Sequence, residues 1–401
     1  MREAVIVGAV RTPLGKRNGK LKDHHPVDLL GDTLNELFAR TGVDPAIVDD
    51  NITGCVMQVG EQAINVGRNA WMSAGLPDHV PSTSVDRQCG SSQQAAHFAA
   101  QGVMANAYDI VVASGVESMT RVPMGSSFAN GPGFPFTQRM FERYEGNLVP
   151  QGISAELIAG RWGFTREQAD ALGFRSQQLA QQATKEGRFQ REIYPIKIAG
   201  ENGTTELFET DEGLRETSLE KLASLKPAFY DENIGKKFPE IRWVVTAANS
   251  SQITDGAAAM LVTTPEKAKE LGLKPRARFH TFSVAAADPV LMLTAVIPAT
   301  QKALARSGLK IEDIDRFEVN EAFATVLLAW KKDLGVSDAI FEERVNVNGG
   351  AIALGHPLGA SGARLMVTLL HELERSGGRY GLQTMCEGGG MSNATIIERL
   401  D

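Results

Sequence analysis

Within its first quarter the chain reads Ser84-Val85-Asp86-Arg87-Gln88-Cys89-Gly90-Ser91-Ser92. Small residues continue through Gln93-Gln94-Ala95-Ala96 and open a helical pattern. The segment therefore predicts a strand that turns into a helix, with a cysteine at the junction. The free N–H groups and the positive dipole end of a helix favour a thiolate at such a place. Cys89 is thus a candidate nucleophile, although a buried cysteine that only packs is the commoner case.

The same order of elements recurs in the second half of the chain. After the Cys89 turn and its helix comes an apolar strand that ends in Gly115-Val116-Glu117-Ser118-Met119. In the second half the turn Gly355-His356-Pro357-Leu358-Gly359-Ala360-Ser361-Gly362 leads into a helix, and then comes Thr384-Met385-Cys386-Glu387-Gly388-Gly389-Gly390-Met391. The repetition favours two similar halves whose corresponding loops meet.

Apolar periodicity indicates an α/β protein with parallel or mixed sheets. Short strands rich in Val and Ile are predicted at Ala4–Val7, Ile110–Ala113, Met260–Thr263 and Thr395–Glu398. Helices are predicted at Val27–Thr41, Arg166–Glu186, Pro298–Ser307 and Ala363–Ser376. Residues 120–245 carry Pro/Gly clusters and many charges without a matching set of strands. We therefore expect an inserted, more irregular domain there that covers the site.

Size and composition narrow the classes of function. A chain of 401 residues divides into two or three domains, and 43% hydrophobic with 22% charged residues is ordinary for a globular protein. The net charge of -7 argues against a nucleic-acid partner. No apolar run approaches the roughly 18 residues of a membrane span. The chain has an odd count of three cysteines, and we recognise neither a signal peptide nor a peroxisomal Ser-Lys-Leu ending in it. These features predict a cytoplasmic protein.

His356 and Cys386 are the other two candidate catalytic side chains. Glycines and Pro357 would fix the direction of the imidazole, which could deprotonate Cys89 and then donate to a substrate oxygen. Cys386 precedes three glycines and could carry a proton to or from carbon, while the glycine backbone donates to an oxyanion. Alone, Cys386 reads as a buried cysteine at a tight turn. The three cysteines have no zinc-like spacing, so no metal site is predicted.

Asn320 follows the predicted strand Arg316–Val319 and opens the sequence Asn320-Glu321-Ala322-Phe323-Ala324. Its amide could donate to a carbonyl oxygen or hold a water. An Asn at the end of a strand is more often a helix cap.

Together these segments resemble the thiolase family, the acyl-CoA C-acyltransferases. The resemblance covers essentially the whole chain, and it includes Val10-Arg11-Thr12-Pro13-Leu14-Gly15-Lys16 and Val245-Thr246-Ala247-Ala248-Asn249-Ser250-Ser251. It implies two duplicated α/β halves in five layers (α/β/α/β/α) with an inserted loop domain. The implied divisions are residues 1–119 plus 246–275, 120–245, and 276–401.

The resemblance also implies the chemistry. Cys89 would be the acylated nucleophile, His356 its base and Cys386 the acid/base at the α-carbon. Asn320, through a water, would join His356 in one oxyanion hole, and the N–H groups of Cys89 and Gly388 would form the other. The implied reaction is CoA-dependent cleavage of a 3-ketoacyl-CoA. Coenzyme A would be a co-substrate, no cofactor would be bound permanently, and the assembly would be a homodimer or homotetramer, with β-oxidation subunits as further partners.

Two positions matched to the family point to coenzyme A. Ser251 would lie near the pantetheine, and Arg215 would lie near the nucleotide, although an exposed, ion-pairing arginine explains Arg215 equally well. Departures from the family concern the substrate. The covering segment has Gln151 and Gly152 where short-chain members carry His, Met and Gly, and Glu387 stands where an apolar residue is usual. Similar residues at these positions occur in actinobacterial lipid- and steroid-degrading thiolases.

Three alternatives remain at this point. An acetoacetyl-CoA-forming acetyl-CoA acetyltransferase would use the same residues. Condensing enzymes of the ketoacyl-synthase or hydroxymethylglutaryl-CoA synthase type lack the second cysteine, so Cys386 argues against them. A non-catalytic acyl-CoA-binding subunit would be expected to have lost Cys89, His356 or Cys386.

Overall fold

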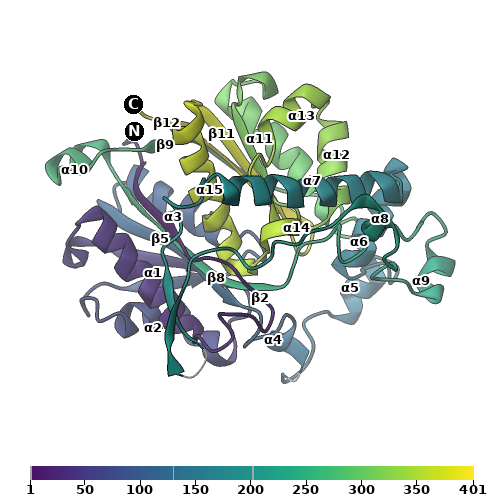
Figure 1. Cartoon of the computed structure of the whole chain (residues 1–401), viewed down its shortest axis with the longest axis horizontal. Coiled ribbons are helices and arrows are strands. Elements are labelled where there is room, and N and C mark those ends of the chain that lie inside the picture. The colour runs from purple at the N-terminus through teal and green to yellow at the C-terminus, as the bar shows by residue number, and fades with distance from the viewer. Residues whose placement is uncertain (1, 130, 201–202) are drawn as a thin grey trace.

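The computed structural model describes residues 2–129, 131–200 and 203–401. Its main sheet has ten strands in the order β10-β11-β12-β9-β1-β8-β5-β3-β4, with β2 paired to β8. Several of these strands are labelled in Figure 1. The strands of the first half are β1 (Val5–Arg11), β2 (Gly15–Lys16), β3 (Asp50–Gly54), β4 (Ser82–Val85), β5 (Ile110–Ser118) and β8 (Thr254–Thr263). Those of the second half are β9 (Ala277–Ala286), β10 (Arg316–Val319), β11 (Tyr380–Glu387) and β12 (Met391–Arg399).

Two copies of one strand arrangement meet where β1 pairs with β9. In the first half-sheet, counted from its outer edge, β4 pairs with β3 and β3 pairs with β5 in parallel. β5 then pairs with β8, and β8 with β1, in the antiparallel direction. The second half repeats these directions in the same order. Val345 bridges to β10 and β10 pairs with β11 in parallel, whereas β11 pairs with β12 and β12 with β9 in the antiparallel direction. Only Val5 and Ile6 connect β1 to β9. The predicted duplication is therefore present in the strand register.

The helices form three layers that alternate with the two half-sheets. α1 (Pro26–Thr41) and α2 (Val66–Ser73) share the outer core of the first half-sheet. α11 (Val296–Ser307) and α12 (Ala324–Asp333) share that of the second. α3 (Ser91–Met104) and α15 (Ser361–Ser376) lie between the half-sheets, in one apolar core with residues of both. This is the predicted five-layer α/β/α/β/α arrangement.

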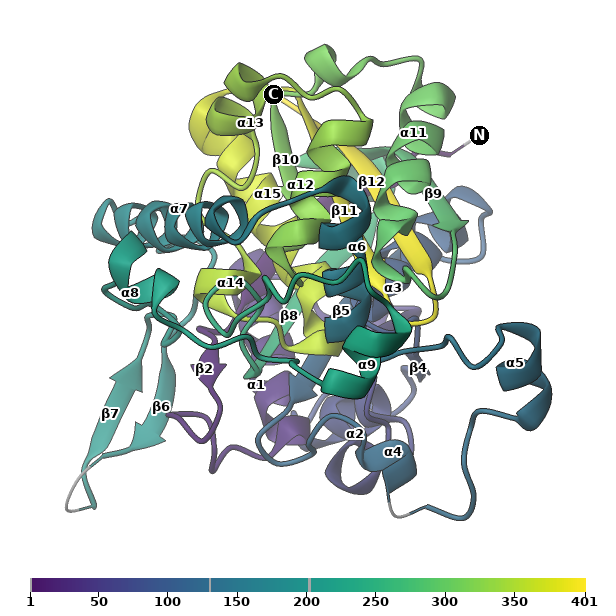
Figure 2. The ribbon, with the colours of Figure 1, turned by 90° about the vertical axis from the view of Figure 1, so that its right-hand side faces the viewer.

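The segment between β5 and β8 differs from both halves. It contains α4 (Ser126–Ala129), α5 (Gln138–Arg143), α6 (Gln151–Trp162), α7 (Arg166–Lys185), α8 (Leu219–Ala223), α9 (Glu232–Lys237) and the two-stranded hairpin β6 (Ile196–Ala199) and β7 (Thr205–Phe208). α6 and α7 pack against α12, while the hairpin projects from the body (Figure 2). The exact domain boundaries stay a prediction. The short helices α10 (Pro265–Glu270), α13 (Asp338–Arg344) and α14 (Ala351–Leu354) complete the two halves.

The predicted strands and helices are confirmed, but the strands are longer than their Val/Ile-rich parts. β5 and β8 continue into runs of Gly, Ala, Ser and acidic residues that do not read as strands. These ends are fully buried, because other backbones lie against them. A Cβ on Gly115, for example, would be 2.6 Å from the carbonyl oxygen of Gly359. Within the described residues, no helix is both long and apolar enough to cross a membrane.

Glycine allows the backbones of α3 and α15 to touch where both helices begin. A Cβ on Gly362 would lie 2.2 Å from the backbone nitrogen of Gln93. Ala363 N–H, at the start of α15, donates to the Ser92 hydroxyl at 2.8 Å. Ser92 therefore satisfies one of the free N–H groups at the start of the facing helix.

Gly362→Ala is expected to destabilise the fold, because the added methyl group would overlap main chain that has no room to shift. The expected loss in free energy of unfolding is about 3 kcal/mol, measured by urea denaturation. Gly131→Ala is the matched control, since its Cβ would meet nothing closer than 3.5 Å. Equal stability of the two variants would mean that α3 and α15 can separate without cost.

Candidate active site

The turn before α3 holds Cys89 in a fixed place. Gln88 has a left-handed backbone conformation (φ 48°), and its N–H donates to Asp86 Oδ1 at 2.7 Å. The N–H of Arg87 donates to Ser91 Oγ at 3.0 Å. A non-glycine residue with positive φ is uncommon and persists where neighbouring contacts support it. Cys89 lies two residues before the helix and is 4% exposed.

The resting form of Cys89 is the thiol. Burial raises the pKa of Cys89 to about 12, and the nearby Glu387 carboxyl acts in the same direction. The backbone N–H of Cys89 and a hydrogen bond from the Gln151 side chain lower the pKa, but by less. The N–H groups at the helix terminus therefore favour the thiolate by less than the desolvation of the charge opposes it. A thiolate at this place requires a base.

His356 is held as a neutral base with a defined tautomer. Its Nδ1 lies 2.5 Å from Ser361 Oγ, and the Ser361 hydroxyl donates to the Pro357 carbonyl at 2.8 Å. Because that hydroxyl proton is committed to Pro357, Nδ1 carries the ring proton and Nε2 is the unprotonated nitrogen. Burial, and secondarily Arg364, lowers the pKa of His356 to about 3. The ring is thus neutral and can accept a proton at Nε2.

Asn320 is the neighbour of that nitrogen. Its Nδ2 lies 3.4 Å from His356 Nε2, and its backbone N–H donates to the Thr384 carbonyl at 3.0 Å. The buried Asn320 Oδ1 has no hydrogen-bond partner among the described residues. Asn320 therefore lies at the site rather than acting as a helix cap, the commoner role of such a residue.

The β11–β12 hairpin brings Cys386 to Cys89. Cys386 is fully buried, and its pKa is raised first by burial and then by the negative charges that Cys89 and Glu387 can carry. A Cβ on Gly388 would be 2.9 Å from Gln88 Oε1, so the glycine loop reaches the turn before Cys89. Cys89 also shares an apolar cluster with Leu358, two residues after His356. The structure thus brings the loops of Cys89, His356 and Cys386 together, while the catalytic roles of these residues stay a prediction.

The two residues predicted to contact coenzyme A are linked by Gln252. The Ser251 N–H donates to the Ala322 carbonyl at 2.9 Å, which places Ser251 beside the Asn320 segment. Arg215 is exposed, and its Nη2 donates to Gln252 Oε1 at 2.9 Å rather than to an acidic residue. The Gln252 carbonyl accepts the His356 N–H at 3.1 Å. Gln252 therefore connects the Arg215 loop to the His356 loop.

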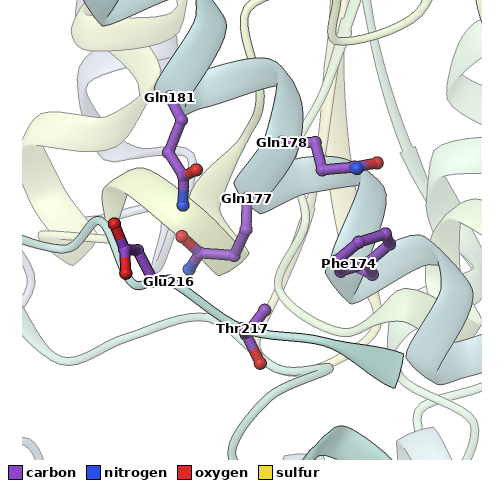
Figure 3. Close-up of a pocket in the computed structure, with 6 residues that line it drawn as sticks. All are labelled: Phe174, Gln177, Gln178, Gln181, Glu216 and Thr217. Carbon is purple, nitrogen blue, oxygen red and sulfur yellow. The ribbon is translucent and has the colours of Figure 1, made fainter. Parts of the chain in front are cut away.

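A pocket of about 360 Å³ lies beside the Arg215 backbone (Figure 3). Gln177 and Gln181 of α7 hold that backbone by hydrogen bonds of 2.9 and 2.8 Å. The lining residues are Phe174, Gln177, Gln178, Gln181, Glu216 and Thr217. The described part of the chain has no group of three or more His, Cys, Asp or Glu side chains arranged to hold a metal ion.

Sequence reasoning missed several residues that build the site. Glu117 was noted only as part of a segment, yet its buried carboxylate accepts the N–H groups of Val56, Met57 and Gly359 at 2.8–3.0 Å. Its place at the end of a buried strand was the available signal. Ser361 and Gln252 carried none, because their partners are backbone groups of loops whose conformation a sequence does not specify.

Family comparisons agree with this geometry. Residues 4–266 match the model of the thiolase N-terminal domain, and residues 273–399 match that of the thiolase C-terminal domain. The chain belongs to the thiolase family. The steroid 3-ketoacyl-CoA thiolase FadA6 of Mycobacterium tuberculosis is 48% identical over 406 residues, covering 100% of this chain and 95% of that protein. A 3-ketoacyl-CoA thiolase of Marinobacter nauticus is 44% identical, covering 100% and 99%.

Solved structures give the same result. The Bacillus anthracis acetyl-CoA acetyltransferase superposes with a TM-score of 0.87 at 38% identity, covering 100% of this chain and 99% of that one. The human mitochondrial 3-ketoacyl-CoA thiolase also has a TM-score of 0.87, at 33% identity and the same coverage. The thiolase fold is therefore shared over the full length of this chain.

Ser361→Ala is expected to slow alkylation of Cys89 by iodoacetamide at pH 7.5 by about tenfold, the equivalent of one lost hydrogen bond. Without the hydroxyl, His356 loses the acceptor that fixes its tautomer. Ser376→Ala, at the far end of the same helix, removes a similar hydroxyl-to-carbonyl bond and should react like the wild type. An unchanged rate in S361A would show that the His356 tautomer does not depend on Ser361.

Proposed function

We propose that this chain is a 3-ketoacyl-CoA thiolase, which cleaves a 3-ketoacyl-CoA with free coenzyme A to acetyl-CoA and a shortened acyl-CoA. The observation that carries the proposal is the pairing of two buried thiols, Cys89 and Cys386, beside a neutral imidazole whose free nitrogen faces Asn320. One thiol serves as nucleophile and the other as acid, which is what cleavage next to a ketone needs. The names of the relatives support the same substrate class.

In the first half-reaction His356 Nε2 takes the proton of Cys89, and the thiolate attacks the 3-keto carbon. The C2–C3 bond then breaks, and its electron pair leaves as the enolate of acetyl-CoA. Cys386 gives its proton to C2, which completes acetyl-CoA and leaves Cys386 as a thiolate. We assign the alkoxide formed at C3 to the N–H groups of Cys89 and Gly388, and the enolate oxygen to His356 and a water held by Asn320.

In the second half-reaction coenzyme A enters and its thiol gives a proton to the Cys386 thiolate. The coenzyme A thiolate attacks the acyl carbon on Cys89, and the Cys89 sulfur departs and regains its proton from His356. Both cysteines end as thiols, as they began. Each substrate thus reacts in turn with one modified form of the protein, so the kinetics are ping-pong.

The co-substrate would lie along Ser251 and Arg215. Ser251 would contact the pantetheine, and the hydrogen bond from the His356 N–H to the carbonyl of the next residue, Gln252, supports this. The exposed Arg215 guanidinium would meet the nucleotide end, and the polar pocket beside its backbone would face the same part of the ligand. No permanently bound cofactor is needed for these steps. We also propose a homodimer or homotetramer that works in the cytoplasm, with β-oxidation subunits as further partners.

The acyl group is proposed to extend beyond four carbons. α6 covers Cys89 with Gln151, and the next residue, Gly152, packs so closely on Phe229 that a Cβ would lie 2.4 Å from that ring. The bulkier pair of side chains found in short-chain members is absent from this segment. An acetyl-CoA acetyltransferase of Syntrophomonas wolfei is 43% identical to this chain, and acetoacetyl-CoA formation is therefore the second candidate.

Initial thiolysis rates with free coenzyme A should be compared from acetoacetyl-CoA through long-chain substrates to a steroid side-chain thioester. The expected maximum lies beyond the four-carbon substrate. A maximum at acetoacetyl-CoA would instead assign the short-chain acetyltransferase. No turnover of any substrate would overturn the enzymatic proposal in favour of an acyl-CoA-binding subunit.

Cys386→Ala should reduce thiolysis by roughly 1000-fold, since a general acid in the transition state contributes about 10²–10⁴-fold. Alkylation of Cys89 should persist in this variant, which separates loss of the acid from loss of the fold. Cys55→Ala removes the third buried cysteine and serves as the control, with turnover near that of the wild type. Full activity in C386A would assign the proton transfer to another group.

A further inference from the structure

Glu387 is a buried carboxyl that the reaction above does not use. It follows Cys386 directly, is 0% exposed, and neither of its side-chain oxygens has a hydrogen-bond partner among the described residues. A Cβ on Gly90, the residue after Cys89, would lie only 1.9 Å from Glu387 Oε1. The carboxyl therefore fills the space between the two cysteine loops. A buried carboxylate is far more costly than a neutral acid, which needs only an acceptor for its one proton.

The side-chain amide of Asn393, next to Glu387, has an oxygen that needs a hydrogen-bond donor. Asn393 Nδ2 donates to Gln94 Oε1 at 3.1 Å and to His97 Nδ1 at 3.3 Å. His97 Nε2 in turn lies 2.7 Å from Thr395 Oγ1. These bonds use both hydrogens of the Asn393 amide nitrogen. Its Oδ1 is buried and has no partner in the part of the chain that the structure describes. That Oδ1 and Glu387 Oε1 both lie near the position that a Cβ on Gly90 would take, at 3.1 and 1.9 Å.

The groups around Glu387 stabilise an anion by less than burial destabilises it. Arg87 and the backbone N–H of Asn393 favour ionisation of Glu387, while Asp86 opposes it. Burial lowers the pKa of His97 to about 3, so this ring is neutral as well. Cys89 and Cys386, the remaining titratable neighbours, both become harder to ionise if Glu387 is charged. Burial accordingly raises the pKa of Glu387 to about 9.

We propose that Glu387 is a positioning residue kept as a neutral acid, which donates its proton to Asn393 Oδ1 and holds the Cys89 turn against the Cys386 hairpin. This role rests on the proposed thiolase function. Each cysteine must become a thiolate at one stage of that reaction. A carboxylate on Glu387 would oppose the ionisation of both cysteines. The neutral acid fills the same space without that repulsion. Ionisation of Glu387 at alkaline pH then lowers the kcat/KM for thiolysis.

The test compares the pH dependence of kcat/KM for thiolysis in the wild type, Glu387→Gln and Glu387→Leu. Glutamine keeps the shape and the donor, so E387Q should retain wild-type kcat/KM at pH 7.5 within about threefold. The wild-type rate should fall above pH 9 as the carboxyl ionises, while E387Q should lose this alkaline limb. E387L lacks the donor and should be impaired at every pH. Identical alkaline limbs in the wild type and E387Q would overturn the proposal, as would a loss of about 100-fold in E387Q at pH 7.5.

Glu318→Gln is the matched control. Burial also raises the pKa of Glu318, to about 8, and its Oε2 likewise has no partner among the described residues. Glu318 is not among the groups that act on the pKa of Cys89 or Cys386. E318Q should therefore retain the wild-type alkaline limb, which distinguishes a local effect from the neutralisation of any buried carboxyl.

Two readouts separate failure of this proposal from failure of the thiolase assignment. Alkylation of Cys89 by iodoacetamide between pH 7 and 10 needs no substrate, and its rate should rise more steeply with pH in E387Q than in the wild type. The infrared difference spectrum of the wild type minus E387Q at pH 7.5 should contain the carbonyl band of a protonated carboxyl. Absence of turnover with both signals intact would overturn only the thiolase reaction, whereas a carboxylate band in that difference spectrum would overturn the neutral acid.

Discussion

The site depends on the contact between two helix N-termini in the middle layer of the fold. α3 begins just after Cys89 and α15 begins just after the His356 turn, and each belongs to a different half. Their backbones approach so closely at Gly362 and Gln93 that one added carbon would overlap main chain. Because the duplicated halves place equivalent loops at this contact, the nucleophile and its base meet without a dedicated connecting segment. The β11–β12 hairpin then adds the second thiol.

Burial determines the chemistry of the assembled groups. The cysteines, the imidazole and Glu387 all lie where a charge is poorly solvated, and each has its pKa displaced toward the neutral form. Charges then arise only in pairs, as a proton moves between neighbouring groups during the reaction. Such a site holds its reactive thiolate back until a substrate supplies the carbonyl that will take up the negative charge. The same burial makes each oxyanion donor more effective than it would be in water.

Much of the fold could be predicted, because apolar periodicity marks β1, β5, β8 and β12 and the long helices. The order of loops around Cys89 and His356 was sufficient to indicate duplication. The protonation of the site could not be predicted. A cysteine before a helix reads as an activated thiol, and only the packing of Glu387 and the covering helix shows that desolvation outweighs the dipole. Ser361 and Gln252 act through backbone groups of distant loops, so no local pattern identifies them.

The most direct test of the account is mass spectrometry of the intact chain mixed with a long-chain 3-ketoacyl-CoA in the absence of free coenzyme A. The account predicts one acyl group per chain, located on Cys89, with one equivalent of acetyl-CoA released. Addition of coenzyme A should then remove the acyl group as acyl-CoA. Release of acetyl-CoA without a protein adduct, or an adduct on Cys386, would contradict the assignment of nucleophile and acid.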